Sequence, residues 1–206
     1  VQGPRDAAIG IADSASEGAV EREAFRARPK LRPGDIVEAV PGVVATQHSG
    51  DGKANQYFLR GFNLDHGTDF AVTVDGMPVN MPTHGHGQGY ADLNFLIPDL
   101  VSGVRYRKGP YFADSGDFSL AGSASLDYLS ALEAPFIETT LGANRLRRLL
   151  AAGSRTRDDQ TWLGAIELEG NDGPWDVPER LRKVNAVVRY SQGSPAQGFH
   201  ITGMAY

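Results

Sequence analysis

Three short runs, in a fixed order, decide the fold of this chain: Leu59-Arg60-Gly61-Phe62, Val74-Asp75-Gly76-Met77-Pro78 and Val104-Arg105-Tyr106-Arg107-Lys108-Gly109-Pro110. In the first run, Gly61 interrupts a strand expected at residues 57–60, and a glycine at such a point usually marks a bulge or a close approach of the backbone. In the second run, Asp-Gly follows the alternating, β-branched segment 70–74. This pattern predicts a tight hairpin, with Asp75 as a turn residue rather than a catalytic acid.

Preceded by Pro41-Gly42-Val43, the three runs resemble the plug domain of TonB-dependent receptors, which import scarce nutrients across the outer membrane of Gram-negative bacteria. The resemblance extends over residues 19–129 and implies an α+β domain in which a small mixed sheet is accompanied by short helices. The local pattern agrees, because Pro-Gly-Asp at residues 33–35 opens a helix that the proline at position 41 ends. A second short helix is expected at residues 98–102.

After residue 132 the sequence becomes a series of alternating apolar and polar segments separated by turns. The five segments are residues 137–142, 145–154, 162–169, 184–191 and 199–202. Such segments with a period of two are typical of outer-membrane β-barrels, and a closed barrel needs at least about eight strands. We therefore expect antiparallel transmembrane β-barrel strands, with the barrel incomplete in this chain and the chain itself the N-terminal part of a receptor. The sequence contains no run of about 18 apolar residues, so it predicts no transmembrane helix.

These patterns divide the chain into three parts. They are a mobile N-terminal segment at residues 1–18, a plug domain at residues 19–132 and the first barrel strands at residues 133–206. Members of the family usually carry a short motif near the N-terminus, the TonB box, which pairs with the TonB protein. No such motif is recognised in residues 1–16. The resemblance alone therefore implies TonB as a partner on the periplasmic side, and a location in the lipid of the outer membrane.

The composition excludes several classes of function. A net charge of −5 argues against a nucleic-acid partner, since such proteins carry an excess of lysine and arginine. The absence of cysteine excludes disulfides and thiolate metal sites. Neither a nucleophile elbow nor a His-Glu-x-x-His motif nor a phosphate-binding loop is present, so we expect no enzymatic activity.

The segment at residues 80–90 is the main candidate for ligand binding because it is rich in glycine and contains two histidines. The resemblance places extracellular ligand on loops at the apex of the plug. The expected ligand contacts in this segment are His84, His86, Gln88 and Tyr90.

The same segment carries a possible metal site. His84 and His86 project to one side of an extended chain, and imidazole suits zinc, copper, nickel and iron. Two histidines alone make a weak site, and the candidates to complete it, if the fold brings them near, are His66, Asp69 and Asp92.

The resemblance also implies that Arg60, Arg105 and Arg107 pair with carboxylates of the barrel wall. It favours a ferric siderophore or another metal complex as the ligand, so that any bound metal is transported rather than held as a cofactor. One alternative is a direct receptor for zinc or nickel ions that uses the histidine pair. A further alternative is a secreted β-rich carbohydrate-binding module, although the sequence places neither Trp162 nor Trp175 in an aromatic cluster.

Overall fold

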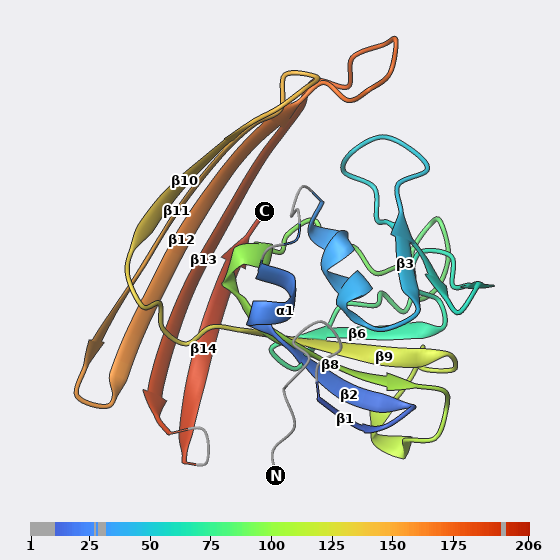
Figure 1. Ribbon diagram of the computed structural model, residues 1–206, viewed down its shortest axis with the longest axis horizontal. Helices are drawn as coiled ribbons and strands as arrows, with labels where there is room; N and C mark the ends of the chain where they lie inside the picture. Colours follow the sequence, from blue (N-terminus) through green and yellow to red (C-terminus); the bar gives the residue numbers. More distant parts are fainter. Residues whose placement is uncertain (1–10, 27, 29–31, 195–196) are drawn as a thin grey trace. The chain divides into compact units, whose positions relative to one another are not determined.

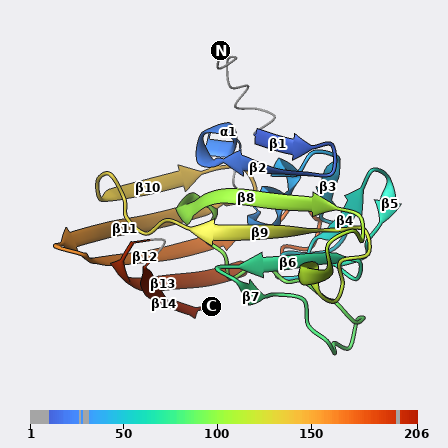
Figure 2. The same ribbon diagram turned by 90° about the horizontal axis from the view of Figure 1, so that it is seen from below.

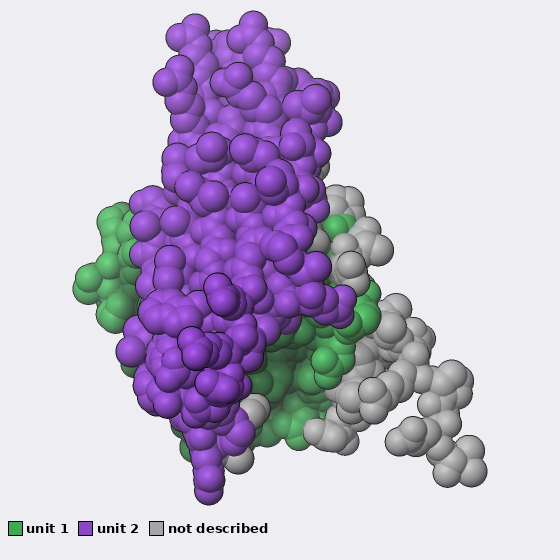
Figure 3. All heavy atoms as spheres, turned by 90° about the vertical axis from the view of Figure 1, so that its left-hand side faces the viewer, with its two compact units in different colours: residues 1–49, 53–94, 98–128 green, residues 50–52, 95–97, 129–206 purple. Residues whose placement is uncertain are grey.

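The computed structural model describes residues 11–26, 28, 32–194 and 197–206, and the chain folds as two compact units. Unit 1 contains the described residues up to 49 together with 53–94 and 98–128, and unit 2 contains 50–52, 95–97 and 129–206 (Figure 3). Within the described part of the chain, no helix has the length and apolar character needed to cross a membrane.

A six-stranded mixed sheet forms the framework of unit 1 (Figure 2). In spatial order its strands are β1 (Ile11–Ser14), β2 (Glu17–Glu21), β8 (Val101–Lys108), β9 (Gly122–Tyr128), β6 (Phe70–Val74) and β7 (Met77–Pro78). The pairing of β6 with β9 is parallel, whereas every other pairing in the sheet is antiparallel. The expected small mixed sheet is therefore present, but it includes strands that the sequence analysis did not predict, among them β9 in its interior and β1 at its edge.

Strand β9 is central in this sheet although its sequence is poor in β-forming residues. It consists of Gly-Ser-Ala-Ser-Leu-Asp-Tyr, and glycine, alanine and aspartate are depleted in strands. Its alternate side chains Ala124, Leu126 and Tyr128 are nevertheless buried. Pairing with β8 on one side and β6 on the other supplies the hydrogen bonds that hold this segment extended.

The Arg60-Gly61 pair forms a turn rather than the expected bulge. It joins β4 (Gln56–Leu59) to β5 (Phe62–Asn63), and together with β3 (Val43–Thr46) these strands make a separate three-stranded sheet. The φ angles of Arg60 and Gly61 are 53° and 82°, which is the pattern of a two-residue type I′ hairpin. A Cβ atom on Gly61 would meet nothing within 4 Å, so no close backbone approach explains this glycine.

The Asp75-Gly76 hairpin between β6 and β7 is confirmed. The φ angles of Asp75 and Gly76 are 50° and 78°, and the Asp75 Oδ1 atom accepts a hydrogen bond of 2.9 Å from the backbone N–H of Tyr128. Asp75 therefore acts as a turn residue that also fixes the end of β9.

Among the residues of unit 1 that the structure describes, four short helices accompany the sheets. They are α1 (Arg22–Arg26) and the 3₁₀ helices η1 (Pro33–Ala39), η2 (Pro98–Leu100) and η3 (Ala113–Ser115). The helix expected from residue 33 is thus present in 3₁₀ form, and its apolar residues Ile36 and Val37 are buried. The helix expected at residues 98–102 ends at residue 100, where β8 follows directly.

Unit 2 is an antiparallel sheet of five strands in chain order (Figure 1). They are β10 (Phe136–Leu141), β11 (Arg147–Arg157), β12 (Gln160–Asn171), β13 (Leu181–Gly193) and β14 (Gly198–Ala205). The five alternating segments predicted after residue 132 are therefore strands. Strands β10 and β14 do not pair with each other, so the sheet is open in the part of the chain described here.

The expected mobile segment at residues 1–18 is described only in part, because its first ten residues lie outside the described ranges. From Ile11 onward it contains β1 and the start of β2, so these residues belong to the sheet. These residues join the sheet because β2 pairs antiparallel with β8 from Glu17 to Glu21 and β1 pairs with β2.

Candidate functional site

Four of the five histidines gather in unit 1. The ring centroid of His66 lies 5.0 Å from that of His48, 4.4 Å from that of His86 and 5.4 Å from that of Tyr90. The ring of His84 stacks on Tyr90 with a centroid distance of 3.9 Å and an interplanar angle of 11°. The cluster joins the loop at residues 80–90 to two other loops of the unit.

His66 is the fixed centre of this cluster, with 1% of its surface exposed. Its Nδ1 atom lies 2.9 Å from the carbonyl oxygen of Ala54 and 3.0 Å from that of Asn55. Because a carbonyl oxygen can only accept, Nδ1 carries the proton and donates it. The Nε2 atom then holds the lone pair, and it has no hydrogen-bond partner among the described residues. Burial lowers the pKa of His66 below its ordinary value, which favours this neutral form.

Asp65 and His86 complete a three-residue group with His66. The Asp65 Oδ1 atom lies 3.7 Å from His66 Nε2 and 3.6 Å from His86 Nε2, and the candidate ligand atoms of the three residues all lie within 4.8 Å of one another. Asp65 has a φ angle of 49°, a left-handed conformation that aspartate tolerates. Its backbone is held on both sides, since its N–H donates to Asn63 Oδ1 at 2.8 Å and its carbonyl accepts from the Tyr57 N–H at 2.8 Å.

The side chain of Asn80 anchors the base of the loop that carries His86. Its Oδ1 atom accepts a hydrogen bond of 2.6 Å from the Val72 N–H. Its Nδ2 atom donates to the carbonyl oxygens of Gly67, Phe70 and Gly89 at 2.9, 3.0 and 3.0 Å. The loop is closed beside this anchor by a backbone bridge between residues 81 and 90. The loop is therefore attached to β6 rather than free.

The predicted apex residues occupy different environments. His84, His86 and Gln88 are exposed, whereas Tyr90 is buried and its hydroxyl oxygen accepts a hydrogen bond of 2.9 Å from the Ala54 N–H. The Nδ1 atom of His84 accepts a hydrogen bond of 3.1 Å from the His86 N–H. The histidine pair is thus adjacent, but only its second member lies in the three-residue group.

Of the residues expected to complete a metal site, the structure brings His66 to His86. Asp92 instead accepts a hydrogen bond from the Asn94 N–H at 2.8 Å, and neither it nor Asp69 belongs to the group. Sequence analysis missed Asp65 as a candidate, although its position directly before His66 is a signal that could have identified it.

Two of the three predicted plug–barrel arginines have partners within unit 1. Arg105 Nη1 lies 2.7 Å from the Asp127 carboxylate, and Arg107 Nη1 lies 2.8 Å from Asp114 Oδ1. The hydrogen bonds from Arg107 hold the pKa of Asp114 below its usual range. Arg60 is exposed at its hairpin turn, and the pairing of these arginines with a barrel wall stays a prediction.

One face of the unit 2 sheet exposes a band of apolar side chains. Leu149, Leu168 and Val184 lie directly opposite one another on neighbouring strands and are all exposed, as are Ile166 and Val188 on the same face. Proteins rarely expose contiguous apolar patches of this kind to water. The band therefore predicts contact with an apolar phase.

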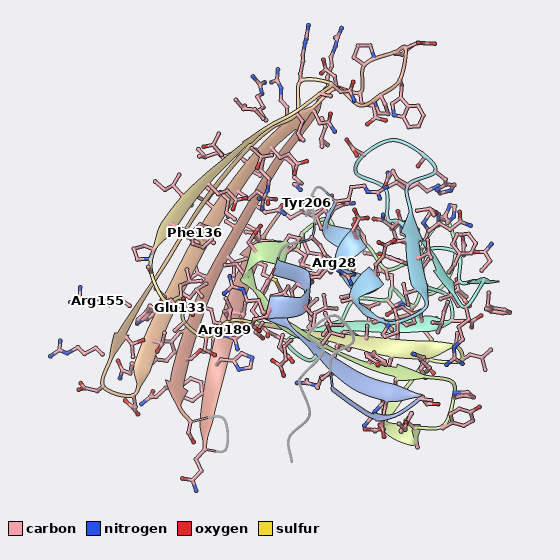
Figure 4. All side chains as sticks on the ribbon, viewed as in Figure 1. Arg28, Glu133, Phe136, Arg155, Arg189 and Tyr206 are labelled. Carbon is pink, nitrogen blue, oxygen red and sulfur yellow. The ribbon has the colours of Figure 1, made fainter. Side chains whose placement is uncertain are left out.

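Trp162 belongs to an aromatic cluster, contrary to the sequence analysis. Its ring centroid lies 4.8 Å from that of Tyr190, which in turn lies 5.9 Å from that of Phe199. The residues are far apart in sequence, and only the register of β12, β13 and β14 brings them together. Arg155, the direct partner of Trp162 in the ladder, points away from the sheet in Figure 4. Aromatic residues beside charged ones are typical of the edge of a lipid-facing band.

The opposite face of the same sheet carries a buried charge network that the sequence did not reveal. Glu167 is 1% exposed; its Oε2 atom lies 2.7 Å from Arg148 Nε, and its Oε1 atom lies 3.2 Å from Lys183 Nζ. Lys183 also lies 2.6 Å from Glu169, and Arg148 lies 3.3 Å from Glu138. These five residues alternate with the apolar band, so one face of the sheet is apolar, while the other combines the charge network with the buried apolar residues Leu150, Leu163 and Val187.

Comparison with known proteins places these features in a family context. Residues 11–123 match the family described as the TonB-dependent receptor plug domain. Among solved structures, a variant of the ferric enterobactin receptor PfeA from Pseudomonas aeruginosa, in complex with enterobactin, matches 94% of this chain and 34% of that chain at 14% identity, with a TM-score of 0.62. The copper transporter OprC matches 96% of this chain and 31% of that chain at 14% identity, with a TM-score of 0.68. The siderophore receptor PirA from Acinetobacter baumannii matches 94% of this chain and 32% of that chain at 16% identity, with a TM-score of 0.62. The chain thus spans about a third of the length of these structures.

Proposed function

Because this chain belongs to the TonB-dependent receptor plug family, we propose that it is the N-terminal part of an outer-membrane receptor for the energised uptake of a scarce nutrient. The proposed nutrient is a ferric siderophore or another metal complex. The TonB protein, on the periplasmic side, is the proposed source of the energy. The family is one of receptors and transporters, and we propose no enzymatic activity.

The match of residues 11–123 to the plug family is the observation that carries this proposal. The fold class expected from the sequence is confirmed: the chain contains a plug domain and antiparallel strands in an open sheet that matches part of a barrel. Residues 19–132 and 133–206 remain our proposed boundaries for the plug and the barrel strands.

The two faces of unit 2 support a location in the outer membrane. Barrel strands in a membrane alternate lipid-facing apolar residues with residues that face the lumen. The band that contains Leu168 and Val188 has the composition of a lipid-facing surface, and the face that contains Glu167 has that of a lumen wall. The cluster of Trp162, Tyr190 and Phe199 fits the aromatic girdle at a membrane interface.

A metal complex is proposed as the ligand because of the loop at residues 80–90. Its exposed His84, His86 and Gln88 side chains offer imidazole and amide groups, which hydrogen-bond or coordinate a metal chelate. Binding there would bias the conformation of a loop that Asn80 connects to the central sheet. Solved structures with this fold include a ferric enterobactin receptor in complex with enterobactin and a copper transporter, and a metal complex as the ligand here is consistent with both.

The test is uptake of iron by cells that carry the receptor at its native length. A Gram-negative strain without its own siderophore receptors would be supplied with a panel of ⁵⁵Fe-labelled siderophores, with and without a functional TonB protein. Uptake that needs both the receptor and TonB is the expected result. A receptor that reaches the outer membrane but transports no member of the panel would contradict the siderophore proposal.

The aromatic cluster of unit 2 does not favour the carbohydrate-binding alternative. The aromatic cluster around Trp162 lies beside the apolar band, where an interfacial girdle accounts for it. The direct metal-ion receptor keeps a specific observation in its favour, namely the group formed by Asp65, His66 and His86.

A further inference from the structure

We propose that Asp65, His66 and His86 form a binding site for a single divalent transition-metal ion, with zinc as the reference ion, that needs no chelator. The site deepens the proposed function by naming a bare cation as a cargo of the receptor. Its role in transport rests on that function, whereas its ability to bind metal does not.

The spacing of the three side chains suits one ion. Ligand atoms about 2.1 Å from a tetrahedral zinc ion lie roughly 3.4 Å apart. The Asp65 carboxylate oxygen lies 3.7 Å from one imidazole nitrogen and 3.6 Å from the other. These two distances exceed the ideal by only a few tenths of an ångström, and the ligand atoms of all three residues lie within 4.8 Å of one another, so small side-chain rotations can bring them around a shared ion.

The hydrogen bonds of His66 prepare it for this role. Histidine ligands of metal ions usually donate their other ring N–H to a carbonyl or carboxylate oxygen, which sets the tautomer and the direction of the lone pair. Here the backbone carbonyls of Ala54 and Asn55 accept from Nδ1 at 2.9 and 3.0 Å. The opposite nitrogen is buried without a hydrogen-bond partner, on the side where Asp65 and His86 lie.

An unpartnered buried nitrogen also needs a physical explanation. A buried polar atom without a hydrogen bond costs about 1–3 kcal/mol in folded proteins. His66 occupies a fully packed position where an apolar ring of similar size would carry no such cost. A metal ion that accepts this lone pair removes the penalty.

The three ligands differ in exposure, and this indicates an exchangeable ion. The side chain of His66 is 1% exposed, whereas those of Asp65 and His86 are 48% and 37% exposed. Structural zinc sites use four protein ligands and are closed, but a site with three protein ligands keeps an open position. One side of this site faces solvent, so an ion has a route in and out.

The ligand chemistry selects the class of ion. Two neutral imidazoles and one carboxylate suit zinc, copper and nickel, whereas magnesium and calcium prefer oxygen ligands throughout. The chain contains no cysteine, so the site lacks the soft thiolate that favours monovalent copper.

Isothermal titration of the receptor, purified at its native length in detergent, with ZnCl₂ tests the site directly. We expect one ion per chain, and at least tenfold weaker binding in the variants His86→Ala and Asp65→Asn. The matched controls are His200→Ala on β14 and Asp69→Asn, which lie outside the group and should bind as the wild type does. The visible absorption of the Co²⁺-loaded protein reports imidazole coordination and four-fold geometry, and we expect both variants to lose it.

Absence of zinc binding in the wild type would overturn the inference, and so would binding that His86→Ala and Asp65→Asn leave unchanged. Uptake of ⁶⁵Zn²⁺ and of ⁵⁵Fe-siderophores by the same cells separates this inference from the proposed function. Iron uptake without zinc binding would refute the metal site and support the receptor. Zinc binding that needs Asp65 and His86, without TonB-dependent uptake of either ion, would support the site and refute the transport function.

Discussion

Replacing Asn80 by alanine is expected to release the loop that carries His86 from the central sheet. Asn80 is 8% exposed, and its side chain makes four hydrogen bonds to the backbone. Its oxygen accepts from Val72 in β6, and its nitrogen donates to three carbonyls, of which Gly89 belongs to the loop itself. One side chain therefore connects the strand to both ends of the loop.

The magnitude follows from the groups that the substitution leaves without partners. A buried N–H that loses its acceptor costs about 1–3 kcal/mol, and each lost hydrogen bond to a carbonyl contributes about 1 kcal/mol. The Nδ2 group has two hydrogens for three carbonyls, so we count two such bonds. The sum is about 3–5 kcal/mol, and entry of water into the vacated space brings it to about 3 kcal/mol. This value corresponds to roughly a 150-fold increase in the population of the open loop.

Hydrogen exchange followed by mass spectrometry measures this opening in the receptor at its native length. Peptides that cover residues 66–91 are expected to exchange roughly 150-fold faster in Asn80→Ala than in the wild type. The variant Asn80→Asp keeps the acceptor for Val72 but turns a carboxylate toward the three carbonyls, so it should be at least as disruptive. Gln88→Ala, an exposed change in the same loop, is the control. Unchanged exchange in Asn80→Ala would refute the anchoring role.

Three further changes test the two units. Glu167→Gln removes a carboxylate shared by two buried cations and is expected to cost about 3 kcal/mol in urea unfolding, against about 1 kcal/mol or less for the half-exposed Glu138→Gln. Val188→Arg places a charge in the apolar band and is expected to cost about 2–4 kcal/mol in lipid vesicles, whereas Val177→Arg in the loop after β12 should be nearly neutral. Gly76→Ala adds a Cβ at a φ of 78° and is expected to lower the free energy of unfolding of the plug by about 1 kcal/mol.

Each of these expectations has an outcome that contradicts it. Equal costs for Glu167→Gln and Glu138→Gln would mean that burial does not strengthen the network. A neutral Val188→Arg in vesicles would place that face away from lipid. For the hairpin, the control is Gly85→Ala, where φ is not positive and the added Cβ meets nothing within 4 Å. A Gly76→Ala effect no larger than that of the control would remove the turn argument.

Features set by neighbouring residues were predictable from the sequence. The hairpin at Asp75-Gly76 depends on two adjacent φ angles, and the five strands of unit 2 depend on a period of two that each segment carries by itself. The sequence predicts a bulge at Arg60-Gly61, where the structure has a turn, because a glycine within a strand pattern can indicate either structure. The distinction required knowing that residues 62–63 pair back onto β4.

Features set by residues far apart in sequence were not predictable. Strand β9 lacks local β-forming character and depends on β6 and β8 beside it. The approach of His66 to His86 spans twenty positions, and the Trp162 cluster depends on the register of three strands. The composition of residues 80–90 alone indicates a ligand-binding loop. That Asp65, and not Asp92, joins the two histidines follows only from the fold.

The strand order of unit 1 has a mechanical consequence. In the order β1-β2-β8-β9-β6-β7, the first two strands of the chain form one edge, and the chain returns to the sheet at β6, on the far side of β8 and β9. A tension applied ahead of Ile11 therefore loads β1 first and β2 second, and each is held to the remaining sheet along one side only. Hydrogen bonds at such an edge break one after another, whereas the pair β6–β9 lies behind β8, away from the pulled edge. Traction from this end would peel the domain stepwise and leave the strand that precedes the histidine loop in place until last.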